Sequence, residues 1–242
     1  MAGGTYAALS GLRTRMEQLD RLASDIANAK TAGYKAERVT LNAAERPDFG
    51  RALQSAIDVA PGPGHLDFRP GSMEKTGRDL DFAIEGRGFF VVDTPQGARY
   101  TRNGNFQLAA DGTVTTADGH AVQTADGPLK LPRNGGEVSV ADDGTVTLGT
   151  QAVGKLRVVD FGDYTELQRE DLGRFRAPST VKPQDAAATT VRSGMLEASN
   201  VSVVDRMVTL TEVARGFEAL QRGLHILSSE LDGRAITELG RR

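Results

Sequence analysis

Residues 9–26 read LSGLRTRMEQLDRLASDI and give the first strong indication of fold. Their apolar positions recur in alternating steps of three and four, as the a and d positions of a heptad repeat do. Thr5 can cap the N-terminus and Gly33 can close the other end, so the pattern predicts a helix over residues 6–30, about 35 Å long. The repeat consists of Leu9, Leu12, Met16, Leu19, Ala23 and Ile26.

The C-terminal end of the chain carries a similar repeat, interrupted at Arg206 with Met207 beside the break. Ser202 and Asp205 resemble a capping box, and Gly233 offers a stop. These signals predict a second helix of about 30 residues and 45 Å. The repeat consists of Val203, Leu210, Val213, Phe217, Leu220, Leu224, Leu227 and Leu231.

A seam two positions wide covers a globular core less well than a broad apolar stripe does, and it suits another helix with the same period. The predicted fold class is therefore α+β, with N- and C-terminal helices paired as a coiled coil and a central, mostly antiparallel β domain. The alternative is that each helix is an ordinary amphipathic helix on a globular core.

The middle of the chain changes to short β-branched and aromatic runs, which predict strands. Turn dipeptides that favour positive φ separate these runs and indicate tight antiparallel hairpins. The predicted strands are 82–85, 89–92, 113–115, 138–140 and 156–159. The turn dipeptides begin at Asn103, Asp111, Asp118, Asp126, Asn134 and Asp143.

Two stretches with weak periodicity, 42–70 and 178–188, are interpreted as extended connectors. The phrase Asp-Gly-Thr-Val occurs at both 111–114 and 143–146, which hairpin chemistry explains without an internal repeat. We therefore predict four segments. They are an N-terminal helical segment, 1–35; an extended connector, 36–75; a central β domain, 76–198; and a C-terminal helical segment that pairs with the first, 199–242.

Composition excludes several classes of protein. The 242 residues are 39% hydrophobic, which suffices for a buried core, and the formal charge of -3 gives no field to gather nucleic acid or an anionic membrane. No cysteine is present, so disulfides and thiolate chemistry are excluded. No apolar run reaches about 18 residues and the start lacks the order of a signal peptide, so composition alone predicts a cytoplasmic protein without membrane insertion.

Motifs for catalysis or cofactor binding are weak. His65, His120 and His225 show no metal-ligand spacing, and no nucleophile elbow or Walker loop occurs. Three carboxylates at 79, 81 and 85 could in principle serve a glycosidase or a calcium site, but they lack the EF-hand pattern. The Gly-x-Gly at 86–88 precedes a predicted strand and lacks a third glycine. The sequence thus predicts no catalytic residue, metal or cofactor.

Four stretches resemble the bacterial flagellar basal-body rod and hook protein family. They are LASDIANAKTAGYK at 22–35, GRDLDFAIEGRGFFVV at 77–92, YTRNGNF at 100–106 and GMLEASNV at 194–201. Their order matches, and the resemblance covers nearly the whole chain. Lys30, Ala32 and the pair Gly216-Phe217 depart from residues common in the family. Compact length and the pairing of DFAIEG at 81–86 with RGFEALQ at 215–221 look more like the proximal rod protein than its distal paralogue.

The resemblance implies a structural subunit of the flagellar rod in the periplasm, which replaces the cytoplasmic prediction. It implies export by the flagellar type III apparatus, and partners that are copies of the chain and other rod proteins. Growth by non-closing contacts would then build a tubular drive shaft through the terminal helices. The residues expected at assembly contacts are Leu9, Leu12, Met16, Leu19, Ile26, Asn28, Gly33, Tyr34, Leu210, Val213, Phe217, Leu220, Leu224 and Leu227.

Three alternatives remain open at this point. The first is a distal rod protein of the same family. The second is a peptidoglycan-acting envelope enzyme that uses Asp79, Asp81 or Glu85. The third is a soluble binding module whose helices grip one partner helix, which would give a defined complex instead of open-ended growth.

Overall fold

The structure is a computed structural model of the whole chain, and the chain divides into two compact units. The helical unit comprises Met1–Ala27, Glu37–His65 and Ser202–Arg242, and the β unit comprises Asn28–Ala36 and Leu66–Val201. The structure describes residues 2–39, 64–132, 136, 138–171, 173–186 and 189–239. Most of the connector expected at 42–70, and the turn expected at Asn134, lie outside these residues.

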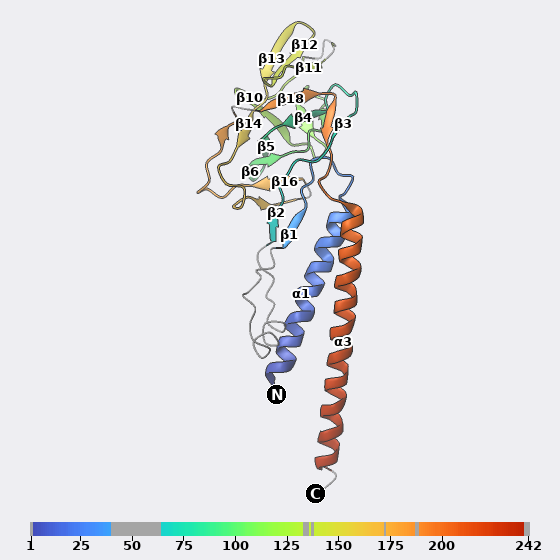
Figure 1. Cartoon of the computed structure of the whole chain (residues 1–242). Coiled ribbons are helices and arrows are strands. Elements are labelled where there is room, and N and C mark those ends of the chain that lie inside the picture. The colour runs from blue at the N-terminus through green and yellow to red at the C-terminus, as the bar shows by residue number, and fades with distance from the viewer. Residues whose placement is uncertain are drawn as a thin grey trace. The chain divides into compact units, whose positions relative to one another are not determined.

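The helical unit contains α1 (Ala2–Ala27) and α3 (Val203–Leu239), which lie side by side and run in opposite directions (Figure 1). The predicted cap of α3 is confirmed, because the Asp205 backbone N–H donates to Ser202 Oγ at 3.4 Å. The predicted cap at Thr5 is wrong, since α1 already begins at Ala2. The predicted stop at Gly233 is also wrong, because α3 continues through it.

The predicted coiled coil, and with it the predicted fold class, is wrong. Seam positions that should be buried as knobs are open to solvent: Leu9 is 57% exposed, Met16 55% and Leu220 37%. The residues that α1 buries include Thr14, Leu22 and Asp25, of which two are polar. The heptad period therefore does not define the buried side of α1. The described chain has two helices, one near each end, and mostly antiparallel strands between them.

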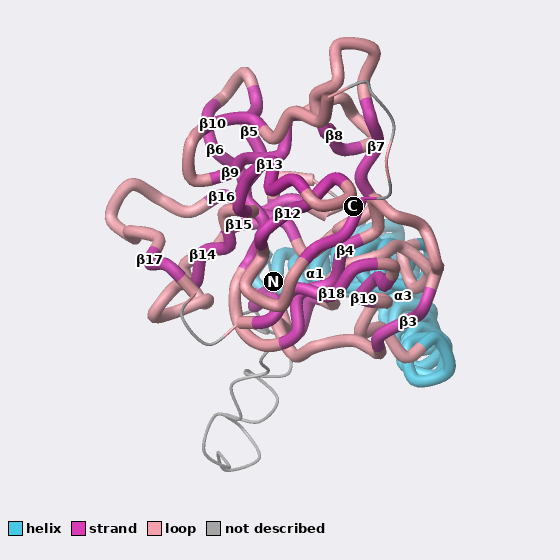
Figure 2. The backbone as a smooth tube through the Cα atoms, turned by 90° about the horizontal axis from the view of Figure 1, so that it is seen from above, coloured by secondary structure: helices cyan, strands magenta, loops and turns pink. Residues whose placement is uncertain are grey.

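The strands fall into several antiparallel groups, and β5 lies at the centre of the largest sheet, whose order is β15-β16-β6-β5-β9-β8-β7 (Figure 2). In it, β10 pairs with β9, and β14 pairs with β5 and β17. The strands of this sheet are β5 (Phe89–Thr94), β6 (Gly97–Thr101), β7 (Phe106–Leu108), β8 (Val114–Thr116), β9 (Ala121–Thr124), β10 (Gly127–Pro128), β14 (Val158–Asp160), β15 (Gln168–Arg169), β16 (Arg174–Arg176) and β17 (Gln184–Asp185).

Smaller groups complete the strand pairing. A three-stranded sheet has the order β11-β12-β13, and the remaining pairs are β1 with β2, β18 with β4, and β19 with β3. These strands are β1 (Glu37–Val39), β2 (Gly64–Leu66), β3 (Met73–Lys75), β4 (Phe82–Glu85), β11 (Val138–Val140), β12 (Thr145–Leu148), β13 (Gln151–Lys155), β18 (Thr190–Ser193) and β19 (Met195–Glu197).

Two Asp-Gly turns are built alike. Gly112 and Gly144 each have φ of 86°, as predicted for these dipeptides. Each preceding aspartate accepts hydrogen bonds from the backbone N–H and the hydroxyl of the threonine two residues later, at 3.0 and 2.8 Å. These bonds stabilise the ionised carboxylate and lower the pKa of Asp111 and of Asp143. The turn chemistry, rather than a wider repeat, accounts for the recurring phrase.

Strand β5 connects two hydrophobic clusters within the β unit, because successive side chains of a strand point to opposite faces. Phe90 and Val92 belong to one cluster, and Phe89 and Val91 belong to the other. The second cluster is rich in aromatic edge contacts, including Phe89 against Phe175 with ring centroids 5.7 Å apart. All four β5 side chains are at most 2% exposed, so this strand supports both halves of the core.

Neither α1 nor α3, over its described residues, offers a stretch long and apolar enough to cross a membrane.

Shortening the side chains of β5 tests whether this strand supports both halves of the hydrophobic core. Phe89→Ala and Phe90→Ala should each lower the free energy of unfolding of the β unit by about 3–5 kcal/mol, because both rings are fully buried. Leu108→Ala is the control, since Leu108 is 50% exposed, and should change it by no more than about 0.5 kcal/mol. Urea unfolding followed by circular dichroism measures all three. If the two core variants and the control lowered the free energy of unfolding equally, the placement of Phe89 and Phe90 in the core would be wrong.

Candidate functional site

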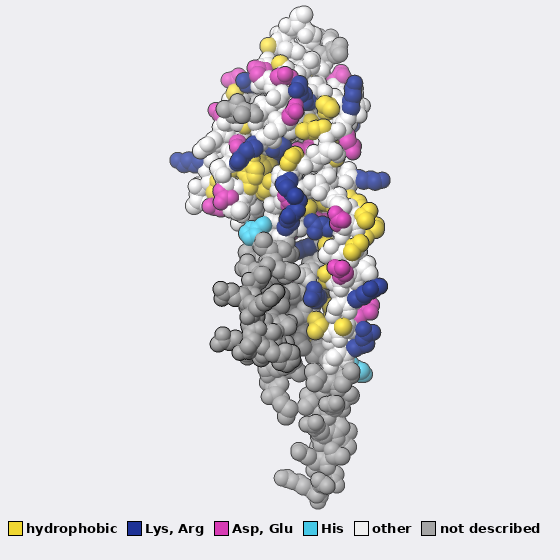
Figure 3. All heavy atoms as spheres, viewed as in Figure 1, with side chains coloured by type: hydrophobic (Ala, Val, Ile, Leu, Met, Phe, Trp, Pro, Cys, Tyr) yellow, Lys and Arg dark blue, Asp and Glu magenta, His cyan; other side chains and the backbone are white. Residues whose placement is uncertain are grey.

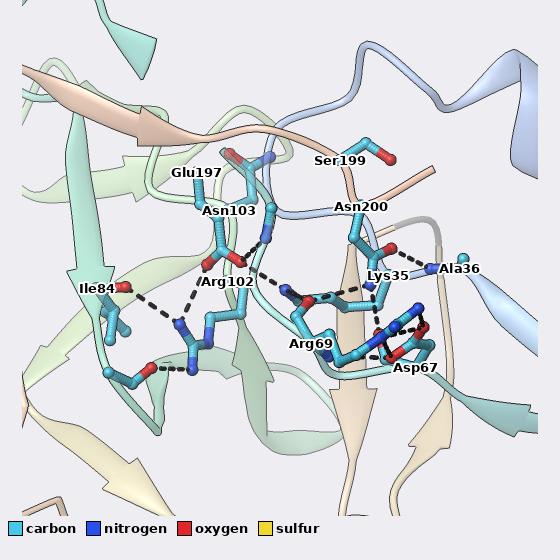
Figure 4. A network of polar contacts seen from close by, with 12 residues as sticks. Lys35, Ala36, Asp67, Arg69, Ile84, Arg102, Asn103, Glu197, Ser199 and Asn200 are labelled. Carbon is cyan, nitrogen blue, oxygen red and sulfur yellow. Dashed lines mark hydrogen bonds and ion pairs between the residues drawn. The ribbon is translucent and has the colours of Figure 1, made fainter. Parts of the chain in front are cut away.

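Three charged side chains meet in the interior of the β unit and form what we call the buried junction: Lys35, Arg102 and Glu197 (Figure 4). Their side chains are 1%, 5% and 0% exposed. Lys35 Nζ lies 2.5 Å from Glu197 Oε1, and Arg102 Nη1 lies 3.1 Å from Glu197 Oε2. One carboxylate thus joins two cations that lie 162 and 95 residues before it in the chain.

Backbone groups bind further atoms of the junction, although Arg102 Nε is buried without a hydrogen-bond partner. Lys35 Nζ donates to the Arg69 carbonyl at 2.9 Å, and the Gly71 N–H donates to Glu197 Oε1 at 3.0 Å. Arg102 donates to two further carbonyls, of Ile84 at 3.2 Å and Gly86 at 2.7 Å. Buried charges are tolerated only when they are paired and hydrogen-bonded in this way.

Burial also sets the protonation chemistry of Lys35. Loss of solvation lowers the pKa of its ammonium group below the usual value, while the Glu197 carboxylate acts in the opposite direction and Arg102 adds to the lowering. No substrate-sized opening accompanies this group among the described residues, since Lys35 and Glu197 are sealed by protein. The junction therefore holds distant chain segments together through one shared carboxylate.

The junction and its neighbours hold the segment Asn28–Ala36 against the rest of the β unit. The Gly33 N–H donates to the Glu197 carbonyl at 2.7 Å, and the Ala36 N–H donates to Asn200 Oδ1 at 2.7 Å. Asn200 Nδ2 in turn donates to the Asp67 carbonyl at 2.7 Å. Residues before α3 thereby bind the segment that follows α1.

Two further contacts hold the segment Asn28–Ala36, one at the ring of Tyr34 and one at the backbone of Gly33. The Arg169 guanidinium lies over the Tyr34 ring, 4.4 Å from its centroid, and donates to the Lys35 carbonyl. Gly33 has φ of 68°, and a Cβ at this position would lie 2.3 Å from the Arg102 carbonyl carbon. Only glycine allows the two backbones to approach so closely.

The helical unit has its own polar cleft of about 440 Å³. At its wall, Arg206 Nε lies 3.2 Å from the Asp25 carboxylate, which is 2% exposed. Arg21 lies 3.5 Å from Glu37 across the same cleft. These paired charges connect α1, β1 and α3, and they explain the interruption of the apolar repeat at Arg206.

The residues predicted at assembly contacts have different environments. In the β unit, Asn28, Gly33 and Tyr34 are buried. In the helical unit, Val213 is buried, Leu12, Leu19, Ile26, Leu210 and Phe217 are partly buried, and Leu9, Met16 and Leu220 are exposed. The side chains of Leu224 and Leu227 lie outside the described part of the structure.

The carboxylates considered for catalysis have structural contacts. Asp81 is 1% exposed and accepts a hydrogen bond from Asn105 Nδ2 at 3.2 Å. Glu85 forms a surface ion pair with Arg192 at 3.0 Å, and Asp79 is exposed. Among the described residues, no group of three or more acidic or histidine side chains is placed to hold a metal ion.

Sequence reasoning assigned no role to Arg102, Glu197 or Asn200, although all three stand inside the stretches that carry the family resemblance. A glutamate between apolar residues, as in Met195-Leu196-Glu197-Ala198, is a signal of a buried ion pair. Its partners could not be identified, because they are distant in sequence.

Removal of the shared carboxylate tests the junction. Glu197→Gln should lower the free energy of unfolding of the β unit by about 3–5 kcal/mol, because it leaves two buried cations without a counter-charge. Glu85→Gln removes the exposed partner of Arg192 and should have little effect. Urea unfolding of the two variants makes the comparison. A similar loss for both would contradict a buried junction.

A second test concerns the close approach at Gly33. Gly33→Ala combines a positive φ with a steric overlap, whereas Gly119→Ala has a positive φ of 83° and open space around its added Cβ. Gly119→Ala should lower the free energy of unfolding by about 1–2 kcal/mol, and Gly33→Ala should lower it clearly more. Thermal unfolding of both variants measures the difference. Equal destabilisation by the two substitutions would contradict the close approach, because the backbones of Gly33 and Arg102 would then move apart without loss of stability.

Comparison with known proteins extends this description. Residues 83–148 match the family model described as the flagellar hook protein FlgE/F/G D1 domain, and residues 192–229 match that described as the flagellar basal body rod FlgEFG protein C-terminal. The second match includes Glu197 of the junction, Asn200 and most of α3.

Similar proteins span nearly the same length as this chain. The flagellar basal-body rod protein FlgF of Caulobacter vibrioides is 32% identical, with 100% of this chain and 99% of the relative covered. FlgF of Salmonella typhimurium is 34% identical, with 95% of each covered. FlgG of Bacillus subtilis is 31% identical, with 90% of this chain and 92% of the relative covered. With such identity along almost its whole length, the chain belongs to the flagellar basal-body rod protein family.

Proposed function

We propose that this chain is a structural subunit of the flagellar basal-body rod, in its proximal part, and that it polymerises through its terminal helices. In this proposal the flagellar type III apparatus exports it to the periplasm, where it joins copies of itself and other rod proteins. Membership of the rod protein family is the observation that carries the proposal.

The distribution of exposed apolar side chains supports assembly through the helices. Among the described residues, the large hydrophobic side chains that are exposed lie almost all in the helical unit, and Leu108 is the exception. Exposed apolar surface of this kind marks a protein interaction site in a soluble subunit. The exposed side chains of the helical unit are Leu9, Met16, Val203, Val204, Met207, Val208 and Leu220.

The β unit supports a different role, that of a folded body attached to the assembling ends. Its two clusters and its junction bury their own apolar and charged groups. The segment held by the junction begins at Asn28, directly after α1, and Asn200 stands three residues before α3. Both helices thus continue from segments that the β unit holds in place.

Two features of the sequence favour the proximal over the distal rod. The sequence is short for the family, and the pairing of DFAIEG at 81–86 with RGFEALQ at 215–221 looks more like the proximal protein. Relatives named FlgF and FlgG both match, which places the choice within one family.

A charge placed inside the helical unit tests the proposal. Val213 is 8% exposed, so Val213→Asp buries an unpaired carboxylate and should abolish incorporation into the rod. Leu108→Asp is the control, because it places the same charge at an exposed site of the β unit, and it should be incorporated normally. Each variant is expressed in the source bacterium deleted for the gene, and purified basal bodies are probed with an antibody against the chain.

Detection of the chain in purified basal bodies distinguishes the possible functions. The unaltered chain should restore motility and appear in the rod, and crosslinks from α1 to neighbouring rod proteins should identify the proximal segment. Basal bodies without the chain would contradict a rod function. Normal incorporation of Val213→Asp would contradict assembly through the helices, and crosslinks to the hook-side neighbours alone would place the chain in the distal rod.

A further inference from the structure

Residues 190–200, which we call the closing segment, contain β18 and β19 and lie near the C-terminal end of the β unit. Among the described strands, β4 pairs with β18 alone and β3 pairs with β19 alone, and Figure 2 shows these four strands together. Arg192 of β18 and Glu85 of β4, which form an exposed ion pair, are 107 residues apart in the chain. The closing segment therefore supplies strand partners that β3 and β4 do not have in neighbouring sequence.

Strand β4 belongs to the interior of the β unit, since Phe82, Ala83 and Ile84 are at most 1% exposed. Val191 of β18 lies opposite Ile84, is 2% exposed, and belongs to the same hydrophobic cluster as Phe82 and Ile84. Its N–H also donates to the Asp142 carbonyl, between β11 and β12, at 3.1 Å. An isolated pair of strands is at best marginally stable, so this pair and the cluster around it depend on each other. Docking of β18 therefore completes both the backbone pairing of β4 and the packing around its side chains.

Backbone hydrogen bonds fix the turn between β18 and β19. The Gly194 N–H donates to the Asp81 carbonyl at 2.8 Å, and the Gly194 carbonyl accepts from the Gly77 N–H at 3.1 Å. Beyond β19, the Ala198 N–H donates to the Ser72 carbonyl at 2.8 Å. Because Asp81 is 1% exposed, a folded unit without the closing segment would bury a backbone carbonyl that lacks this partner.

Glu197 in β19 places a stricter condition on the fold. Its carboxylate is the counter-charge that Lys35 and Arg102 share, and its carbonyl accepts from the Gly33 N–H at 2.7 Å. Many other charged side chains of the β unit lie at the surface, where Figure 3 shows both signs interspersed on the face that it views. Those groups keep contact with water in every state of the chain, whereas the two buried cations can lose water without a large cost only together with Glu197.

We infer that docking of the closing segment limits folding of the β unit, and that the unit has no stable form in which this segment is undocked. Contacts of the segment with β4 and with Lys35 join residues 107 and 162 positions apart, and such contacts form slowly because a long loop must close first. The segment Asn28–Ala36 directly after α1 and Asn200 just before α3 become fixed in the same step. Both statements concern the folding of one copy and are independent of the proposed function.

A disulfide that ties the closing segment to its partner strand tests this directly, because the chain contains no cysteine. Leu196 of β19 lies opposite Glu74 of β3, and residues opposite each other in an antiparallel pair have Cα atoms within disulfide range. The chain with Glu74→Cys and Leu196→Cys should fold about tenfold faster, or more, when oxidised than when reduced, since the long loop is closed beforehand. Stopped-flow dilution from urea measures the rate by tyrosine fluorescence, and three of the four tyrosines lie in the β unit.

A second cysteine pair is the matched control. Asp93 and Ala98 are exposed and lie opposite each other in the hairpin of β5 and β6, so Asp93→Cys with Ala98→Cys closes only a short loop. Its oxidation should change the folding rate by less than about threefold. Equal acceleration by both disulfides would overturn the inference. So would an oxidised 74–196 pair that folds at the rate of the reduced chain and only unfolds more slowly, because the segment would then dock after the rate-limiting step.

Amide hydrogen exchange of the unaltered chain gives a test that needs no cysteine. The amides of Val191, Gly194 and Ala198 in the closing segment donate hydrogen bonds, as does the amide of Val91 in β5. All four should have protection factors within about threefold of one another, because they open in the same global unfolding step. Protection of the three closing-segment amides that is lower than that of Val91 by about tenfold or more would show a stable unit with the segment undocked, and would overturn the inference.

Discussion

The β unit depends on one buried carboxylate, that of Glu197, which lies between Lys35 and Arg102. An ion group of this kind is costly to bury and is tolerated only when every partner is in place. Its three members come from the segment after α1, from the residue that directly follows β6 and from β19. The interior of the β unit is therefore complete only when the segment that carries Lys35 and the strand that carries Glu197 are both packed in place. The ion pair between them links the first and last parts of this unit without a disulfide.

The two units distribute their surfaces in opposite ways. The β unit buries aromatic side chains around β5 and pairs the charges of its junction, and among its described residues Leu108 is the exposed large hydrophobic side chain. The helical unit keeps an interior ion pair between Asp25 and Arg206 and leaves apolar faces on both helices. Under the proposed function, the exposed faces of the helices stay available for contacts between copies after the β unit has folded.

The sequence allowed some of this to be predicted, and the limits have physical causes. The Asp-Gly turns were predictable because positive φ at glycine is a local property, as at Gly112 and Gly144. The coiled coil was predicted wrongly because the heptad pattern of α1 was taken to mark its buried side, whereas Leu9 and Met16 face solvent. Arg206 looked like a defect of the repeat, and its partner Asp25 is 181 residues away.

The same reasoning explains what was missed at the candidate site. Glu197 and Arg102 were visible as parts of family stretches, but the pairing of residues so distant in sequence is a property of the fold. Gly33 was expected at a helix end, yet its main constraint is the backbone of Arg102, which no local pattern contains. Local chemistry was readable from sequence, and long-range polar contacts were not.

Amide hydrogen exchange, compared between the free chain and the chain in isolated basal bodies, tests the central claim most directly. If the helices are the assembling part, amides of α1 and α3 gain protection on incorporation, while those of β5 and β6 keep the protection that they have in the free chain. Gain of protection in the strands of the β unit, with α1 and α3 unchanged, would contradict assembly through the terminal helices.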